Sequence, residues 1–84
     1  MIRIPSMKGD KIFDCITQEK DGTKYIICTP KVKDKEGNLV PIGSRPAVFR
    51  KVSETTAVVE DDGGLDIETL DELDRRVIPK FLRG

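Results

Sequence analysis

Histidine and tryptophan are absent from this sequence, and aromatic residues make up only 5% of it. Without histidine the chain lacks the commonest general base and the commonest side-chain metal ligand, which excludes catalytic triads of the Ser-His and Cys-His kinds. Two glycine-rich phosphate-binding motifs, Gly-x-Gly-x-x-Gly and Gly-x-x-x-x-Gly-Lys-Ser/Thr, are both absent from the sequence. We therefore expect a protein that is not an enzyme and that binds no cofactor.

Long apolar runs are also missing. No run approaches the roughly 18 residues that a membrane-spanning helix needs, and the first residues lack the apolar region of a signal peptide. We expect a cytoplasmic protein with no membrane partner. The 84 residues match the size of a single domain, residues 1–84.

The net charge is zero, but the positive and negative residues are unevenly distributed along the chain. Residues 1–52 carry eleven Lys/Arg against six Asp/Glu, and residues 53–84 carry four against nine. Two interpretations are open. The halves attract one another inside one fold, or each sign marks a separate contact surface.

The clearest local pattern is a β-hairpin. Residues 11–17 and 24–29 are rich in β-branched and aromatic side chains, and Asp21-Gly22 between them favours a two-residue turn. With this turn, facing positions sum to 43, so Cys15 faces Cys28. Both cysteines then lie on the expected core face, together with Phe13, Ile26 and Pro30.

The two cysteines neither complete a zinc site nor form a Cys-x-x-Cys pair. As a facing, non-hydrogen-bonded pair their Cα atoms should lie about 4.5 Å apart, at the short end of disulfide geometry. A reducing cytoplasm favours two buried free thiols, with a disulfide as the alternative. On the same strand we expect Asp14 to be exposed and to face Thr29; the alternative is a buried acid with a raised pKa.

Further turn signals divide the rest of the first sixty residues into strands. Residues 34–38 separate 31–33 from 39–40, and Ser53-Glu54 separates 47–52 from 55–60. The prediction is a twisted five-stranded antiparallel meander over residues 11–60, or an SH3/OB-like partial barrel. An N-terminal arm, residues 1–8, precedes it.

An amphipathic helix follows the breaker Asp62-Gly63-Gly64, which makes the fold class α+β. We predict it over residues 66–78, with a core stripe of Ile67, Leu70, Leu73 and Val77. Proline at position 79 should end or kink the helix near residue 77 or 78, leaving residues 79–84 as a tail.

The favoured function is a non-catalytic protein-interaction module: an accessory or adaptor subunit, or an inhibitor of the phage or mobile-element type. Residues 60–74 hold eight acids and no base, which favours a protein partner with a basic surface. Apolar residues at both ends, among them Met1, Ile2, Ile4 and Met7, either dock on a partner or fold back into the core. The predicted contact residues are Asp61, Asp62, Asp66, Glu68, Asp71, Glu72, Asp74, Phe81 and Leu82. A homo-oligomer is also compatible with the sequence.

Two other kinds of site are weighed against this one. A nucleic-acid-binding barrel would use Tyr25 or Phe49 for stacking, but the aromatic residues are few and the net charge is zero. The acidic stretch 60–68 lacks the alternating pattern of a calcium loop, so we expect no metal site. The predicted phosphate-binding residues of the alternative are Lys31, Lys33, Lys35, Arg45, Arg50 and Lys51.

Overall fold

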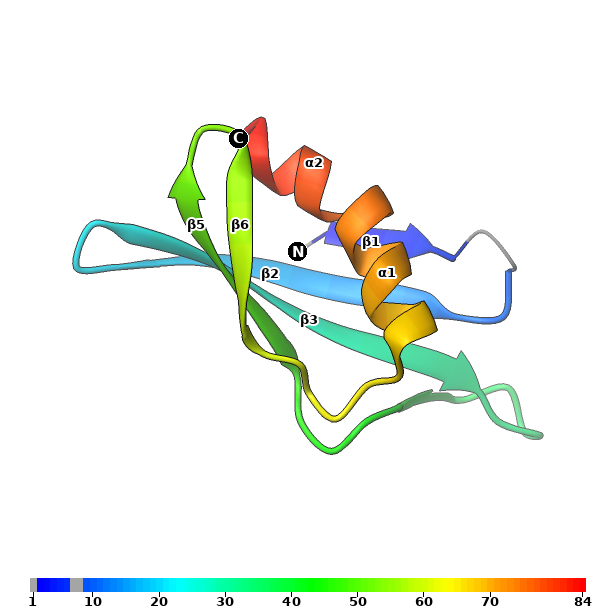
Figure 1. The fold of residues 1–84 in the computed structure, drawn as a ribbon. Helices are drawn as coiled ribbons and strands as arrows, with labels where there is room; N and C mark the ends of the chain where they lie inside the picture. The colour runs from blue at the N-terminus through cyan, green and yellow to red at the C-terminus, as the bar shows by residue number, and fades with distance from the viewer. Residues whose placement is uncertain (1, 7–8) are drawn as a thin grey trace.

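The computed structural model describes residues 2–6 and 9–84. Its strands and helices form an antiparallel sheet with two helices on one face, which confirms the α+β class (Figure 1). The strands are β1 (Ile2–Pro5), β2 (Ile12–Lys20), β3 (Thr23–Lys33), β4 (Leu39–Pro41), β5 (Ala47–Ser53) and β6 (Thr56–Asp61), and the helices are α1 (Ile67–Arg76) and α2 (Ile78–Leu82).

The sheet has six strands, not the five predicted. Its order is β1-β2-β3-β5-β6, and β4 pairs with the far end of β3. The additional strand is β1, which lies in the segment predicted to be an arm. Ile2 and Ile4 alternate with Arg3 as a strand requires, but four residues are too few for that pattern to be recognised. Met1 and Met7 lie outside the described residues.

The β2–β3 hairpin has the predicted register, with Cys15 opposite Cys28 and a turn at Asp21 and Gly22. Both turn residues have positive φ, 53° and 79°, which this type of tight hairpin turn demands. Residues 31–33 continue the second predicted strand and form the end of β3. Both β4 and β5 pair with the same side of β3, so they resemble one strand interrupted by residues 42–46. No pairing between β1 and β6 closes the described sheet into a barrel.

The core lies between the sheet and the two helices. Leu73 and Val77 are fully buried against it, as the helical period predicted, but Ile67 is 84% exposed. The prediction for Ile67 is wrong because the buried side of the first turn carries Thr69, which is fully buried, and a residue two positions away lies on the opposite side of a helix. The sheet contributes Phe13, Cys15, Ile26, Cys28, Ala47 and Phe49 to the core.

Residues near both ends of the chain pack into this core. Ile4 and Phe81 are each 5% exposed, and Leu82 packs at the edge of the core. Residues 79–84 are therefore not a loose tail: α1 ends at Arg76, near the predicted break, and α2 begins at residue 78. Proline at 79 falls in the first turn of α2, where its missing N–H is not needed.

Two predictions about β2 are wrong. Cys15 and Cys28 form a disulfide, with Cα atoms 4.1 Å apart, rather than two free thiols; the tight register brings them within bonding reach. Asp14 is 7% exposed, not solvent-facing, because β1 brings Arg3 alongside it. The cytoplasmic location stays a prediction. Neither described helix is long and apolar enough to cross a membrane.

Asp14 also differs from the alternative of a buried acid with a raised pKa. Arg3 donates to both carboxylate oxygens of Asp14, at 2.6 and 3.1 Å, and Lys31 lies 3.1 Å from one of them. The hydrogen bond from Arg3 lowers the pKa of Asp14, Lys31 lowers it further, and burial only partly opposes them. Asp14 is therefore an ionised structural residue.

Candidate protein-binding surface

The nine residues predicted to contact a partner do not form one surface. Phe81 lies in the core and Leu82 at its edge. The seven acids divide into two groups: Asp61 and Asp62 at the end of β6, and five acids on or just before α1. The first group is bound by an arginine, whereas the second lies at the start of α1 and along it.

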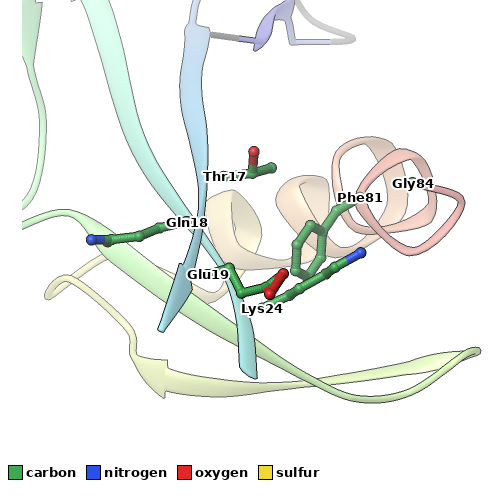
Figure 2. A pocket seen from close by; sticks show the side chains of 6 residues that line it. All are labelled: Thr17, Gln18, Glu19, Lys24, Phe81 and Gly84. Atoms are coloured by element: carbon green, nitrogen blue, oxygen red, sulfur yellow. The ribbon is translucent and has the colours of Figure 1, made fainter. Parts of the chain in front are cut away.

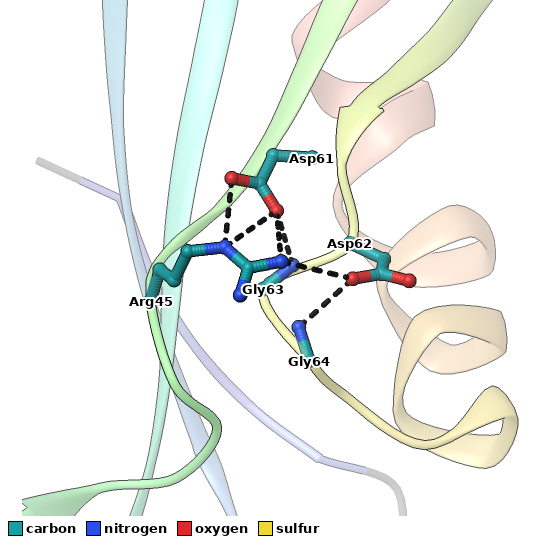
Figure 3. Close-up of polar contacts among 5 residues, drawn as sticks. All are labelled: Arg45, Asp61, Asp62, Gly63 and Gly64. Carbon is teal, nitrogen blue, oxygen red and sulfur yellow. Dashed lines mark hydrogen bonds and ion pairs between the residues drawn. The ribbon is translucent and has the colours of Figure 1, made fainter.

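Arg45 holds the first group (Figure 3). Its Nε donates to both carboxylate oxygens of Asp61 at 3.0 Å, and its Nη2 lies 2.8 Å from Asp61 and 3.5 Å from Asp62. The backbone N–H groups of Gly63 and Gly64 donate to the same two carboxylates at 2.9 Å. The Arg45 hydrogen bond lowers the pKa of Asp61. These acids stabilise a turn.

Close packing between two loops makes this turn possible. The carbonyl oxygen of Gly63 accepts from the N–H groups of Ser44 and Arg45, at 2.9 and 3.3 Å. Gly63 has a φ of 69°, and a Cβ atom there would lie 2.5 Å from the carbonyl oxygen of Arg45. Glycine is therefore required at this position. The contact fixes the point at which the chain leaves β6 and enters α1.

The five acids of the second group differ in their surroundings. Asp66 directly precedes α1 and accepts from the Thr69 hydroxyl, which lowers the pKa of Asp66. Asp71 pairs with Arg75 one turn along the helix. Asp74 is exposed and forms no ion pair with any described residue. Glu68 is exposed and Glu72 is partly buried.

A groove runs between β6 and the outer side of α1. It has a volume of about 220 Å³. Val59, on the edge strand, is 53% exposed, and Ile67, in the first turn of α1, is 84% exposed. Asp71 and Asp74 form its rim. We call this the α1–β6 groove; its lining residues are Phe49, Val59, Ile67, Leu70, Asp71 and Asp74.

Sequence reasoning identified the acids of this groove but missed its apolar floor. Ile67 fits the helical period of a core residue, and Val59 fits a strand. Their exposure depends on which side of α1 packs against the sheet, and Thr69, not Ile67, lies on that side. The one signal in the sequence is that Ile67 stands between Asp66 and Glu68, an acidic context unusual for a core residue.

The basic residues of the nucleic-acid alternative are dispersed and mostly paired. Lys31 contacts Asp14, Arg45 contacts Asp61, and Arg50 pairs with Glu60. Lys51 lies 3.8 Å from Glu54 and 3.5 Å from the carbonyl oxygen of Leu82. Of the six candidates, Lys33 and Lys35 form no ion pair with the described residues.

The aromatic residues of that alternative do not form a stacking platform. Phe49 is buried in the core and is not available to a base. Tyr25 is partly exposed and lies opposite Arg50 in the sheet, whose guanidinium is paired with a carboxylate. A single accessible aromatic ring provides one stacking contact at most, whereas groove binders of single strands use several.

A smaller cavity of about 180 Å³ lies near the turn of the β2–β3 hairpin (Figure 2). The ring of Phe81 lies beside the side chains of Glu19 and Lys24, and Gln18 points away. Glu19 is the only acid among its lining residues, which are Thr17, Gln18, Glu19, Lys24, Phe81 and Gly84. A volume below about 300 Å³ is small for a substrate site. Within residues 2–6 and 9–84 no three acids or cysteines group as metal ligands.

No family model matches this sequence, and comparisons with curated proteins and with solved structures find no match.

Proposed function

We propose that this protein is a non-catalytic binding module that recognises a partner protein through the α1–β6 groove. The partner presents an apolar side chain flanked by Lys or Arg. The observation that supports this is the combination of exposed apolar side chains, Val59 and Ile67, with an acidic rim, Asp71 and Asp74.

The apolar part of the groove supplies a driving force for association. Burying one Val or Ile side chain that was in water contributes about 1.5–3 kcal/mol. Ile67 is 84% exposed and Val59 53% exposed, so both have most of this contribution still to gain. Two large apolar side chains adjoining one groove mark an interaction surface more strongly than scattered ones do.

The acidic rim orients the partner and favours a partner surface with positive charge. Residues 60–74 contain eight acids and no base. Arg45 and Arg50 pair with three of the acids at the β6 end. The rim acids Asp71 and Asp74 lie farther along, on the exposed side of α1. Such a field attracts a basic surface, and the attraction weakens as salt is raised.

This proposal differs from the sequence-based expectation in one respect. The chain ends were expected to be candidates for docking, but Ile4 and Phe81 complete the protein's own core. The apolar contact is therefore assigned to Val59 and Ile67. The nucleic-acid alternative has less support, because most of its cations are already paired with carboxylates.

The test is quantitative co-purification of the tagged protein from its native host, in parallel with two variants. The first, Asp71→Asn/Asp74→Asn, removes two charges at the groove rim. The control, Glu19→Gln/Glu36→Gln, removes two charges on exposed turns and strands elsewhere. We expect a specific protein to be retained by the wild type and the control, and to fall at least tenfold with the rim variant.

Raising salt from about 50 to 500 mM should weaken the same complex, because screening shortens the reach of the rim charges. An unchanged set of partners in the rim variant would contradict the proposal. If binding is lost in the control variant instead, the contact surface lies near Glu19 or Glu36 and not at the groove.

A further inference from the structure

Strand β6 forms one edge of the sheet. Among the described residues it pairs only with β5, so its outer side carries unpaired backbone N–H and C=O groups. Such an edge is a template for an added strand unless it is protected. The sequence Thr56-Ala57-Val58-Val59-Glu60-Asp61 contains neither proline nor lysine, two residues that commonly protect edges.

The opposite edge is built differently. Strand β1 has four residues and includes Arg3 and Pro5, and both a short length and a proline discourage pairing. On β6, the pairing with β5 is continuous from Ala57 to Val59, and the irregular pairs lie on either side of it. Residues 57–59 therefore form a short regular stretch with an unpaired outer side, and residues 16–20 of β2, which extend beyond β1, form another.

Helix α1 lies on the side of β6 away from β5, across the groove (Figure 1). A strand added to β6 would place every second side chain on the face that carries Phe49 and Val59. Those side chains would enter the groove below Ile67 and Leu70. Residues two positions away lie on the same face, within reach of the carboxylates of Asp71 or Asp74.

We propose that the partner binds as an extended segment that adds a strand to the β6 edge, with an apolar residue and a Lys or Arg two positions apart facing the α1–β6 groove. This inference rests on the proposed function and specifies its mode of recognition. Backbone hydrogen bonds then supply much of the affinity, and the groove supplies the specificity.

Charge decides between this occupant and a second copy of the chain. Two copies paired through β6 would bring together two segments that each carry eight acids and no base, of which three are paired with Arg45 or Arg50. Like charges across a closely packed interface are costly. A basic segment has the opposite sign and meets no such repulsion, so it is the occupant that the rim favours.

The probe is a phage-displayed library of random twelve-residue peptides, selected on the folded protein and counter-selected on Ile67→Lys. We expect enrichment of an apolar residue and a basic residue two positions apart. The synthetic form of the most enriched peptide should lose at least tenfold in affinity with Val59→Lys or Asp71→Asn/Asp74→Asn. Ile16→Lys, an exposed position on the other sheet face, is the matched control and should change affinity less than twofold.

Backbone methylation of the peptide separates strand addition from side-chain docking. In a strand, alternate N–H groups donate to the neighbour, so methylating every second nitrogen should abolish binding and methylating the others should not. Hydrogen exchange of the amides of residues 56–59 should slow at least tenfold in the complex. Sedimentation of the protein alone should give a monomer.

Several outcomes would overturn strand addition while leaving the proposed function in place. One is a peptide that depends on Asp71 and Asp74 but tolerates methylation at every nitrogen. Another is a library that yields no binder although the co-purified partner is sensitive to the rim charges. If the protein forms a dimer and Val59→Lys dissociates it, the occupant of the β6 edge is a second copy of the chain and not a peptide segment. If the enriched peptide is sensitive to Ile16→Lys instead, both proposals fail.

Discussion

The two edges of the sheet use their carboxylates in opposite ways. At the β1 edge, Asp14 is buried beneath Arg3 and Lys31 and is neutralised within the protein. At the β6 edge, the rim acids Asp71 and Asp74 lie in solvent beside exposed apolar side chains. One edge is short and bound to its neighbours, whereas the other presents an open strand and a groove.

This difference separates acids that stabilise the fold from acids that do not. A buried carboxylate that accepts two hydrogen bonds from an arginine contributes to folding because its ionised form is favoured in the native state. Of the two rim acids, Asp71 pairs with Arg75 within α1, whereas Asp74 is exposed and forms no ion pair with a described residue. Acids of the second kind are the ones available to a basic partner.

The largest expected effect on stability comes from α1, where one side faces the core and the other faces the groove. Leu73→Ala should lower the free energy of unfolding by about 2–5 kcal/mol, because it leaves a cavity at a fully buried position. Ile67→Ala should change it by less than about 0.5 kcal/mol. Urea denaturation measures both. Similar losses of unfolding free energy in the two variants would show that Ile67 packs in the core. That result would contradict its assignment to the α1–β6 groove.

The next effect concerns the disulfide, which lies next to Asp14 on the β1 side. Cys15 and Cys28 are 13 positions apart, and closing a loop of this size contributes about 3 kcal/mol. Denaturation with and without reductant, monitored by mass for thiol content, should show this loss. Unfolding curves that coincide in the two conditions would mean that the bond is not a stabilising part of the native protein.

Asp14→Asn should lower the free energy of unfolding by about 1–3 kcal/mol, because the buried carboxylate's charge-assisted hydrogen bonds are lost. Glu19→Gln, on an exposed part of the same strand, is the control and should be nearly neutral.

The effect of Asp14 should also depend on pH. Its pKa is lowered in the folded state, so its stabilisation is present above the ordinary carboxyl pKa of about 3.9 and is lost as the pH falls through the lowered value. The gap between wild type and Asp14→Asn should therefore narrow in acid. A gap that stays constant to pH 2 would contradict an ionised Asp14.

The smallest expected effect is an increase in stability, from a substitution of Asp74 on the groove rim. Its absence would contradict the distinction between the two kinds of acid. Asp74 lies three positions after Asp71 on α1, and like charges at this spacing destabilise a helix by about 0.2–0.5 kcal/mol. Asp74→Asn should therefore raise the stability slightly, and about 0.5 M salt should abolish the gain. Thermal denaturation at low salt is the measurement. A clear loss of stability would mean that this acid belongs to the fold rather than to the rim.

Much of the fold could be predicted because its signals are local. Asp21-Gly22 favours one turn type, and that turn sets the register that places Cys15 opposite Cys28. The helical period identified Leu73 and Val77 as core residues. Each of these features depends on neighbours within one or two turns of chain.

The candidate site was predicted only in part, because its apolar floor depends on contacts between distant segments. Asp71 and Asp74 belong to an acidic stretch that is visible in the sequence. The exposure of Ile67 depends on which side of α1 packs against the sheet, and that side carries Thr69 and Leu73. The burial of Asp14 depends on β1, a strand too short to recognise.

By itself, the sequence determined the hairpin register, the α+β class and the acidic character of α1, because turn chemistry, residue period and charge are properties of short segments. Only the tertiary structure decided which apolar residues of the C-terminal segment remain exposed and which acids are neutralised. Those outcomes depend on how the strand edges and the helix ends meet, and chain segments that are far apart in the sequence determine that meeting.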